Sequence, residues 1–323
     1  MCQAEWDWAD SMARTDENIA VAPLDLVIER IRRVYRSWSR DTPVAQMRSD
    51  WDAAFQPCTV AVSYERVSAG GVDGGWIAGS DAHHDKAILY FHGGGFRLGS
   101  VSSHRELIAR IANTSGCRVL AINYGLAPEH RFPAPLEDAI AAYGWMLDQG
   151  LSPEDIAFAG DSAGGNLVLA AMLSLRERGA PLPAAAVLMS PWTDLAATGA
   201  SYVSRADADP IHARPMILAL AKNYLGEHGD PFHPLASPLY AELAGLPPLL
   251  IQVGDRETVL DDSVMFADKA RAAGIDVELQ IWDGMIHVFQ MFASELAEAR
   301  QAINSIAAFL NKHLQMNVDR SPQ

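Results

Sequence analysis

The chain has 323 residues, enough for one large domain with an added lid or for two small domains, and a core of this size needs no disulfide bonds. A formal net charge of −15 argues against nucleic acid as a partner and against stable association with an anionic membrane. The sequence has no apolar run of the roughly 18 residues that span a membrane, and it does not start like a secretory signal. Cys2, Cys58 and Cys117 lack the spacing of metal ligands, so we expect reduced thiols and a cytoplasmic protein.

Short apolar runs alternate with longer amphipathic segments along most of the chain. Two strands near the start are joined by a glycine-rich turn at 70–74, which is typical of a hairpin at the edge of a sheet. The eight predicted strands are 59–66, 75–79, 87–91, 118–123, 156–159, 185–190, 248–253 and 277–282. The predicted helices are 103–114, 134–149, 166–178, 262–273 and 294–314. From about residue 87 onward, this alternation predicts an α/β fold with a parallel sheet wrapped by helices.

Two stretches interrupt this alternation. Residues 22–55 are helical in character, and the segment 194–226 carries two helical runs separated by Asp209-Pro210. Ligands of α/β sheets bind beyond the carboxyl ends of the strands, so an insertion after a strand is well placed to cover such a site. We therefore expect a helical cap made of residues 1–55 and 194–227, over a core made of residues 56–193 and 228–323.

The pentapeptide Gly160-Asp161-Ser162-Ala163-Gly164 has the form G-x-S-x-G and lies between the strand 156–159 and the helix 166–178. In the nucleophile elbow of α/β-hydrolases, this order of strand, sharp turn and helix exposes a serine hydroxyl above the sheet. The adjacent helix N-terminus favours negative charge. The flanking glycines are required because a Cβ at either position would crowd the neighbouring strand and helix. The motif thus predicts Ser162 as a nucleophile.

A second glycine motif, His92-Gly93-Gly94-Gly95-Phe96, directly follows the strand 87–91. Acyl transfer develops negative charge on a carbonyl oxygen, and losing one fixed backbone N–H that stabilises this charge costs about 3 kcal/mol. HGGG sequences form such an oxyanion loop in lipases and esterases. We expect the N–H groups of Gly93, Gly94 and Ala163 to be the donors.

A serine nucleophile needs a base, and the base needs an acid that orients it; in this fold the chain order is serine, acid, histidine. His287 lies in a glycine-containing loop after the last strand, so we predict it as the base. The segment after strand 248–253 offers several acids, of which Asp261 and Asp262 resemble helix-capping residues. Glu257 can span the loop with its longer side chain and is the predicted acid, with Asp255 as the alternative.

Taken together, these motifs resemble those of the hormone-sensitive-lipase-like α/β-hydrolases, the bacterial family IV carboxylesterases. The resemblance covers roughly residues 55–315 and includes Tyr124-Gly125-Leu126-Ala127-Pro128-Glu129-His130 and Gly284-Met285-Ile286-His287-Val288-Phe289. Gly125 stands where the family usually has arginine, and 257–262 differs from the common acid segment Asp-Pro-Leu-Arg-Asp-Glu. A glutamate at the acid position is similar to one branch of the family, which favours Glu257 over Asp255.

The resemblance implies an α/β-hydrolase fold with a mostly parallel eight-stranded sheet and a helical cap. It also implies hydrolysis of short-chain acyl esters through an acyl-enzyme, no cofactor or metal, and frequent homodimers. The segment 124–133 is expected to support the oxyanion loop. We expect the substrate pocket to be lined by Phe96, Trp192, Met216, Leu220 and Phe289.

Two other functions are compatible with the same motifs. The machinery can act on an amide, such as an N-acetyl or N-formyl group, and nothing in the motifs separates ester from amide. A ligand-binding protein on this fold, as in the plant hormone receptors of the family, usually lacks the histidine, whereas His287 is present here.

Overall fold

The computed structural model describes residues 22–316, so the predictions for residues 1–21 of the cap and for the polar C-terminal end lie outside the described residues. The described chain forms an eight-stranded sheet in the order β1-β2-β4-β3-β5-β6-β7-β8. β2 runs antiparallel to both β1 and β4, and every other neighbouring pair is parallel. The mostly parallel eight-stranded sheet predicted from the sequence is therefore confirmed.

The strands are β1 Ser63–Ala69, β2 Val72–Ala78, β3 His83–Phe91, β4 Cys117–Ile122, β5 Ile156–Asp161, β6 Ala185–Met189, β7 Leu249–Gly254 and β8 Val277–Trp282. The helices are α1 Pro23–Arg36, α2 Val44–Phe55, α3 Arg105–Ser115, α4 Ala134–Asp148, α5 Ala163–Glu177, α6 Ser201–Ser204, α7 Arg214–Leu225, α8 Leu260–Ala272 and α9 Ala297–His313. Short 3₁₀ turns lie at Pro153–Asp155, Pro238–Tyr240 and Phe289–Phe292. α5 begins directly after Ser162, earlier than the predicted start at residue 166.

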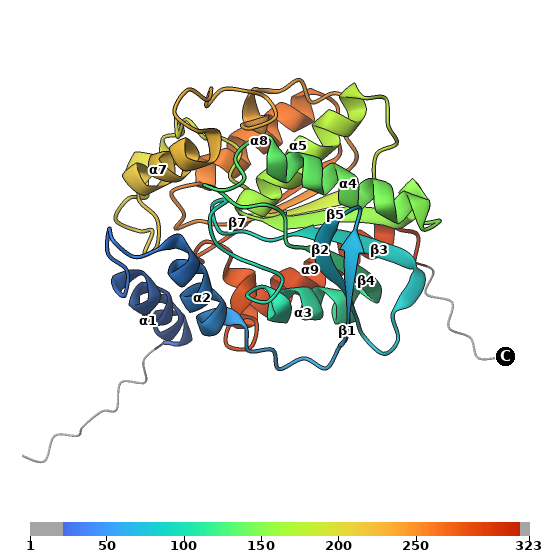
Figure 1. Cartoon of the computed structure of the whole chain (residues 1–323), viewed down its shortest axis with the longest axis horizontal. Helices are drawn as coiled ribbons and strands as arrows, with labels where there is room; N and C mark the ends of the chain where they lie inside the picture. Colours follow the sequence, from blue (N-terminus) through green and yellow to red (C-terminus); the bar gives the residue numbers. More distant parts are fainter. Residues whose placement is uncertain (1–21, 317–323) are drawn as a thin grey trace, which may run out of the picture.

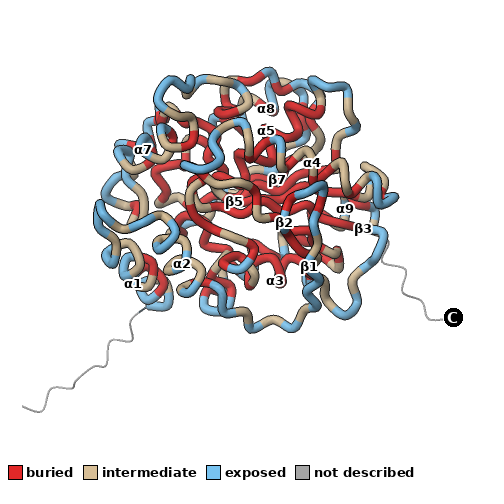
Figure 2. The backbone as a smooth tube through the Cα atoms, viewed as in Figure 1, coloured by how far each residue is buried: buried red, intermediate tan, exposed pale blue. Residues whose placement is uncertain are grey.

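Helices cover both faces of the sheet (Figure 1). α3 and α9 pack on one face, and α4, α5 and α8 pack on the other. β5, β6 and β7 are buried along their full length, which explains why their sequences are nearly continuous apolar runs. Figure 2 shows the buried residues concentrated in the sheet and in the helix faces that contact it. The loops after the parallel strands meet at one edge of this sheet, where α/β proteins bind ligands.

The edge hairpin differs from its prediction. Its turn consists of Gly70 and Gly71 alone, with φ angles of +63° and +93°. β2 begins at Val72, so Gly74, which we expected in the turn, lies inside the strand. A Cβ on Gly74 would press on the main chain of β4 at Ala121. This glycine therefore permits close strand pairing, and it does not form a turn.

α1, α2 and α7 lie on the same side of the molecule, at the left of Figure 1. The Nε of Arg32 in α1 donates to the carbonyl oxygen of Pro210 in the insertion, with 3.1 Å between the two atoms. The first part of the insertion instead packs on the core, because Asp262 of α8 accepts a hydrogen bond from the N–H of Asp194. The part of the insertion that approaches α1 is thus the segment around Pro210 and α7.

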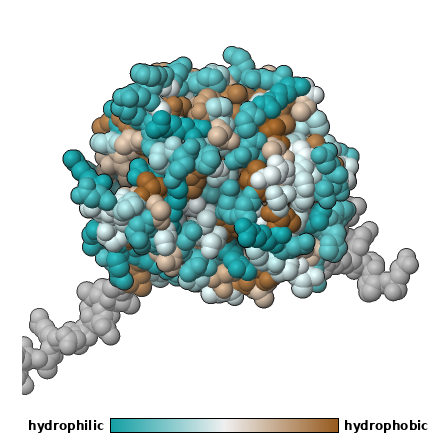
Figure 3. All heavy atoms as spheres, in the orientation of Figure 1, coloured by the Kyte–Doolittle hydropathy of each residue, from teal (hydrophilic) through white to brown (hydrophobic). Residues whose placement is uncertain are grey.

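The surface is mostly polar. Figure 3 shows hydrophilic side chains over most of the face in view, with apolar side chains in small scattered groups. None of the helices between residues 22 and 316 combines the length and the apolar character that a membrane span requires.

We expect Gly164→Ala to lower the free energy of unfolding by about 1–3 kcal/mol, because its Cβ would collide with the main chain at Phe91. Gly144→Ala in α4 is the matched control, since a Cβ there meets nothing within 4 Å. Replacing this helical glycine should raise the free energy of unfolding by about 0.5–1 kcal/mol. Urea denaturation measures both, and equal stability of the two variants would contradict the argument.

Candidate active site

Ser162 forms the sharp turn between β5 and α5. Its φ of 52° and ψ of −117° lie in a region that non-glycine residues rarely adopt, at a cost of about 1–3 kcal/mol. The turn is held by its main chain: the N–H of Ser162 donates to Met189 at 2.9 Å, and its carbonyl oxygen accepts from Trp192 at 3.1 Å. The side chain is thereby presented at the start of a helix, in the geometry that the glycine motif predicts.

The structure brings Glu257 and His287 into contact. The Nδ1 of His287 lies 2.6 Å from Oε2 of Glu257, and the glutamate is fully buried. The other carboxylate oxygen, Oε1, accepts hydrogen bonds from the hydroxyl of Ser190 at 2.8 Å and from the N–H of Gly254 at 2.5 Å. The hydroxyl of Ser190 in turn accepts from the N–H of Val288 at 3.1 Å. The sequence reasoning did not find Ser190, which holds both partners of the pair in place.

The other acids near Glu257 bind the main chain. Asp255 accepts a hydrogen bond from the N–H of Gly284 at 2.7 Å, which stabilises the turn after β8. Asp261 accepts from the N–H of Ser201 in the insertion, and Asp262 accepts from the N–H of Thr193 directly before it. Of these carboxylates, the one that contacts the imidazole of His287 is therefore that of Glu257.

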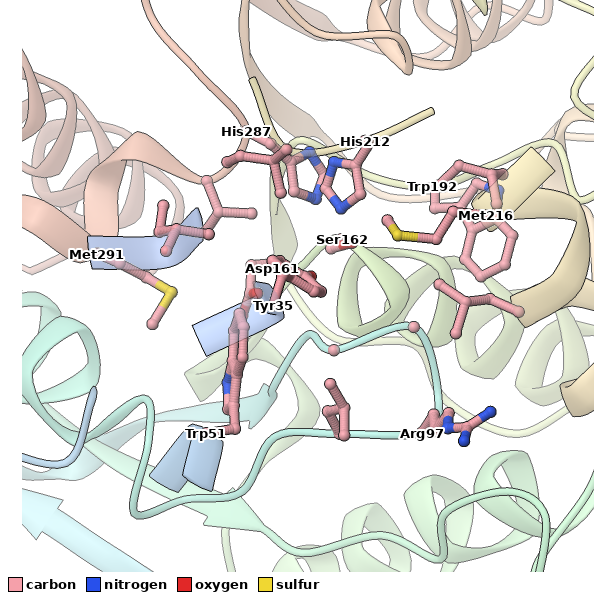
Figure 4. Close-up of a pocket in the computed structure, with 18 of the residues that line it drawn as sticks. Tyr35, Trp51, Arg97, Asp161, Ser162, Trp192, His212, Met216, His287 and Met291 are labelled. Carbon is pink, nitrogen blue, oxygen red and sulfur yellow. The ribbon is translucent and has the colours of Figure 1, made fainter. Parts of the chain in front are cut away.

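The charge of Glu257 sets the protonation of His287. Burial alone lowers the pKa of this imidazole because it disfavours the charged form. The carboxylate of Glu257 and its hydrogen bond outweigh burial, so the pKa of His287 is raised above its ordinary value of 6.5. His287 and Ser162 line the same cavity, and Figure 4 shows His287 near the serine.

A buried ion pair lies beside the serine. The carboxylate of Asp161 accepts a hydrogen bond from the hydroxyl of Tyr90 at 2.6 Å, and it lies 3.3 Å from Nε2 of His104. Burial works against both charges, but their mutual attraction lowers the pKa of Asp161 and raises that of His104. The pair fixes the side chain of the residue that precedes Ser162.

The glycine loop after β3 borders the cavity through Gly94 and Gly95, and not through Gly93. A Cβ on Gly93 would collide with Asp161, so its α-carbon packs on the buried ion pair. Among the described residues, no backbone carbonyl accepts a hydrogen bond from the N–H of Gly94 or Gly95. The structure therefore favours Gly94 and Gly95, instead of Gly93 and Gly94, as the glycine pair that faces Ser162; the donor Ala163 follows the serine at the start of α5.

The loop is supported from behind by 124–133, as the sequence suggested. The ring of Tyr124 stacks on His92 with 4.4 Å between centroids, and its hydroxyl donates to the carbonyl oxygen of His92 at 2.5 Å. The N–H of Ala127 donates to the carbonyl oxygen of Phe96 at 2.8 Å. Arg48 of α2 donates to the carbonyl oxygens of Arg97 and Ala127, each at 2.9 Å.

The cavity has a volume of about 310 Å³. Three of the five predicted pocket residues, Trp192, Met216 and Leu220, line it. The prediction is wrong for the other two, because Phe96 stacks on Tyr224 at 3.8 Å and Phe289 packs in the core beside α9. Both rings are fully buried.

Several lining residues were missed from the sequence. They are aromatic side chains of α1, α2 and the loop between them, Arg97 directly after the glycine loop, and His212 of the insertion; the aromatic residues are Tyr35, Trp38, Trp51 and Phe55. Helical spacing in 22–55 indicated an apolar face, but a single sequence does not show what that face covers. Within residues 22–316, no three His, Cys, Asp or Glu side chains are grouped so as to hold a metal ion.

Comparison with known families matches residues 88–291 to the model of the alpha/beta hydrolase fold. The chain therefore belongs to the α/β-hydrolase fold family, and within it to the hormone-sensitive-lipase-like carboxylesterases that its motifs resemble.

Individual relatives agree with this membership. An acetyl-hydrolase of Streptomyces hygroscopicus is 45% identical over 225 residues, which are 70% of this chain and 75% of the relative. An esterase of Acinetobacter venetianus is 38% identical over 253 residues, which are 78% of this chain and 83% of the relative. The crystal structure of an esterase from the bacterial hormone-sensitive lipase family is 46% identical, with a TM-score of 0.87, and the match covers 90% of this chain and 98% of that chain.

We expect Glu257→Gln to lower the pKa of His287, because the variant removes the negative charge that stabilises the imidazolium. The imidazole then loses its proton at a lower pH than in the wild type. Asp255→Asn is the matched control and should leave this pKa nearly unchanged, since Asp255 binds the N–H of Gly284. NMR titration of the imidazole C–H signals measures both, and an equal shift in the two variants would show that Glu257 is not the dominant charge.

Proposed function

We propose that this chain, a carboxylic ester hydrolase by its family, cleaves esters of short-chain acids through a Ser162–His287–Glu257 triad and an acyl-enzyme. The observation that carries the proposal is the buried contact of 2.6 Å between Glu257 and His287, beside the cavity that Ser162 lines. A serine at a strained strand-to-helix turn and an imidazole oriented by a carboxylate are the parts that nucleophilic acyl transfer requires.

In the first half of the reaction, the hydroxyl of Ser162 attacks the ester carbonyl carbon while His287 takes its proton. Glu257 keeps the imidazole in the tautomer with the proton on Nδ1 and stabilises the imidazolium that forms. The oxyanion receives hydrogen bonds from the N–H groups of Gly94, Gly95 and Ala163. His287 then gives its proton to the alcohol oxygen, the bond between carbonyl carbon and alcohol oxygen breaks, and the acyl group stays on Ser162.

In the second half, water takes the place of the alcohol. His287 accepts a proton from the water, whose oxygen attacks the acyl carbon, and the same N–H groups stabilise the second oxyanion. Collapse of this intermediate returns the proton from His287 to Ser162 and releases the acid. The raised pKa of His287 implies that activity falls as the pH decreases through a value above 6.5, because the base must be neutral.

The cavity supports small substrates. Its volume of about 310 Å³ is at the lower end of ligand pockets, and apolar side chains such as Trp192, Met216 and Leu220 form part of its wall. We place ester hydrolysis before amide hydrolysis because a relative matched over 83% of its length and a solved structure matched over 98% of its chain are named esterases. Rates on matched esters and amides of one acid test this order directly.

We expect Ser162→Ala to abolish turnover of p-nitrophenyl butyrate, because the nucleophile is removed. Mass spectrometry of the wild type during turnover should show a population heavier by one butyryl group, and the variant should show none. Equal turnover by wild type and variant would refute the proposed nucleophile.

We expect Glu257→Gln to reduce kcat on the same ester by about 10⁴-fold, the loss typical when the orienting carboxylate of a triad becomes an amide. Asp255→Asn should change kcat by less than about tenfold, since Asp255 contacts the turn at Gly284. A larger loss in Asp255→Asn than in Glu257→Gln would assign the triad acid to Asp255.

A further inference from the structure

His212, from the insertion between β6 and β7, lies against the imidazole of His287. The two rings meet edge to face, with centroids 4.4 Å apart and planes at 86°. Figure 4 shows them side by side at the top of the cavity. The side chain of His212 is 11% exposed and lines the cavity together with Ser162. The reaction described above assigns no role to this second imidazole.

The carboxylate of Asp209 fixes the segment that carries His212. One oxygen accepts hydrogen bonds from the N–H groups of Ile211 and His212, each at 2.9 Å. The other accepts from the N–H and the hydroxyl of Thr258, at 2.8 and 3.0 Å. Thr258 follows Glu257 in the chain, so one buried carboxylate connects the insertion to the loop of the triad acid.

Two arginines hold the same segment from either side. The Nε of Arg32 in α1 donates to the carbonyl oxygen of Pro210, and the Nε of Arg256 donates to that of Ala208, both at 3.1 Å. His212 is therefore positioned before any substrate arrives, as a group that recognises a ligand must be.

The protonation state of His212 follows from its neighbours. Burial and the nearby His287 lower the pKa of His212 to about 4, against the opposing charge of Asp209, so the ring is neutral when His287 acts as a base. Nδ1 is buried and makes no hydrogen bond with any described residue, but Oδ2 of Asp209 lies 3.9 Å away and its charge favours the proton on this nitrogen. Nε2 then carries the lone pair on the other side of the ring, which lines the cavity.

Most of the cavity wall offers no hydrogen-bond acceptor. Met216, Ile217, Leu220 and Val259 are among its apolar lining residues. The polar side chains Asp161 and His104 also line it, but they bind each other. Trp38, Trp51 and Arg97 offer donors and no acceptor, and the hydroxyl of Tyr35 lines the cavity as well. A free acceptor in such surroundings selects for a ligand that brings a donor, because an analogue without one leaves the acceptor unpaired.

The place of His212 also decides which part of the substrate it meets. His287 gives its proton to the departing alcohol, so the alcohol oxygen lies next to the imidazole of His287 when the ester bond breaks. A side chain that contacts His287 and lines the same cavity therefore borders the alcohol half of the ester. The oxyanion donors Gly94 and Gly95 border the carbonyl oxygen instead.

We propose that His212 is a specificity-determining residue whose Nε2 accepts a hydrogen bond from a second hydroxyl on the alcohol half of the ester. The preferred substrates are then short-chain esters of diols and polyols, ahead of esters of simple alcohols. This inference rests on the proposed esterase function.

Glycerol monoacetate and propyl acetate test the proposal, because both contain acetate and a three-carbon alcohol and form the same acetyl-enzyme. The quantity to measure is the ratio of their kcat/KM values. We expect the wild type to favour glycerol monoacetate by about tenfold, the effect of one hydrogen bond, and His212→Phe to remove this preference. His212→Leu serves the same purpose if the phenylalanine variant does not fold. His228→Phe, at an exposed position just after the cap insertion, is the matched control and should keep the wild-type ratio.

The ratio separates the alternatives. A ratio that is the same in wild type and His212→Phe overturns the proposal, even if both rates fall, because it shows that His212 acts only through His287 or through folding. A wild-type protein that favours propyl acetate also overturns it. Absence of turnover of either acetate by the wild type would refute the esterase proposal itself, and with it this inference.

Discussion

The structure depends on one buried contact, the hydrogen bond between the carboxylate of Glu257 and the imidazole of His287. A charged carboxylate without water is costly unless its oxygens are paired, and here both are, by His287, Ser190 and Gly254. Ser190 and His287 come from the loops after β6 and β8, Gly254 ends β7, and Glu257 itself lies in the loop after β7. Satisfying one buried charge thus fixes the relative positions of three loops that are far apart in the sequence.

The same principle extends the site toward the insertion. Thr258, next to Glu257, donates to Asp209, and Asp209 positions His212. Asp161, next to Ser162, is paired with His104 and Tyr90. The buried carboxylates of Asp161 and Asp209 are therefore hydrogen-bonded by partners within the protein. Ser162, His212 and the N–H groups of Gly94 and Gly95 line the cavity without a hydrogen-bond partner among the described residues.

The parts of the site predicted from the sequence are those that a local motif fixes. A short motif predicts the strand, turn and helix around Ser162, and the chain order of serine, acid and histidine predicts Glu257 and His287. The eight strands are predicted from short apolar runs. The glycines that border the cavity are Gly94 and Gly95, one residue later than the predicted pair Gly93 and Gly94, because Gly93 packs on Asp161. Phe289 was assigned to the pocket although its ring points into the core beside α9, and residue spacing does not determine side-chain direction in an irregular loop.

The N-terminal helices of the cap were predicted as helical but not as a source of lining residues, whereas Met216 and Leu220 of the insertion were predicted to line the pocket and do. Tyr35, Trp38 and Trp51 line the cavity because α1 and α2 pack on the core. The sequence of 22–55 by itself does not show where these helices pack. His212 was not predicted for the same reason: its partner His287 is distant in the sequence and belongs to another loop.

Arg48 of α2 also connects the helical cap to the core. Its guanidinium binds two carbonyl groups, those of Arg97 and Ala127, and forms an ion pair with Glu129. Arg97 follows the glycine loop, and Ala127 belongs to the segment behind it. The helical cap and the core are consequently not interchangeable. A chimera that takes α1 and α2 from a relative without arginine at this position would leave the carbonyl oxygens of Arg97 and Ala127 without this donor. Sequence changes in the cap are thereby linked to the shape of the oxyanion loop.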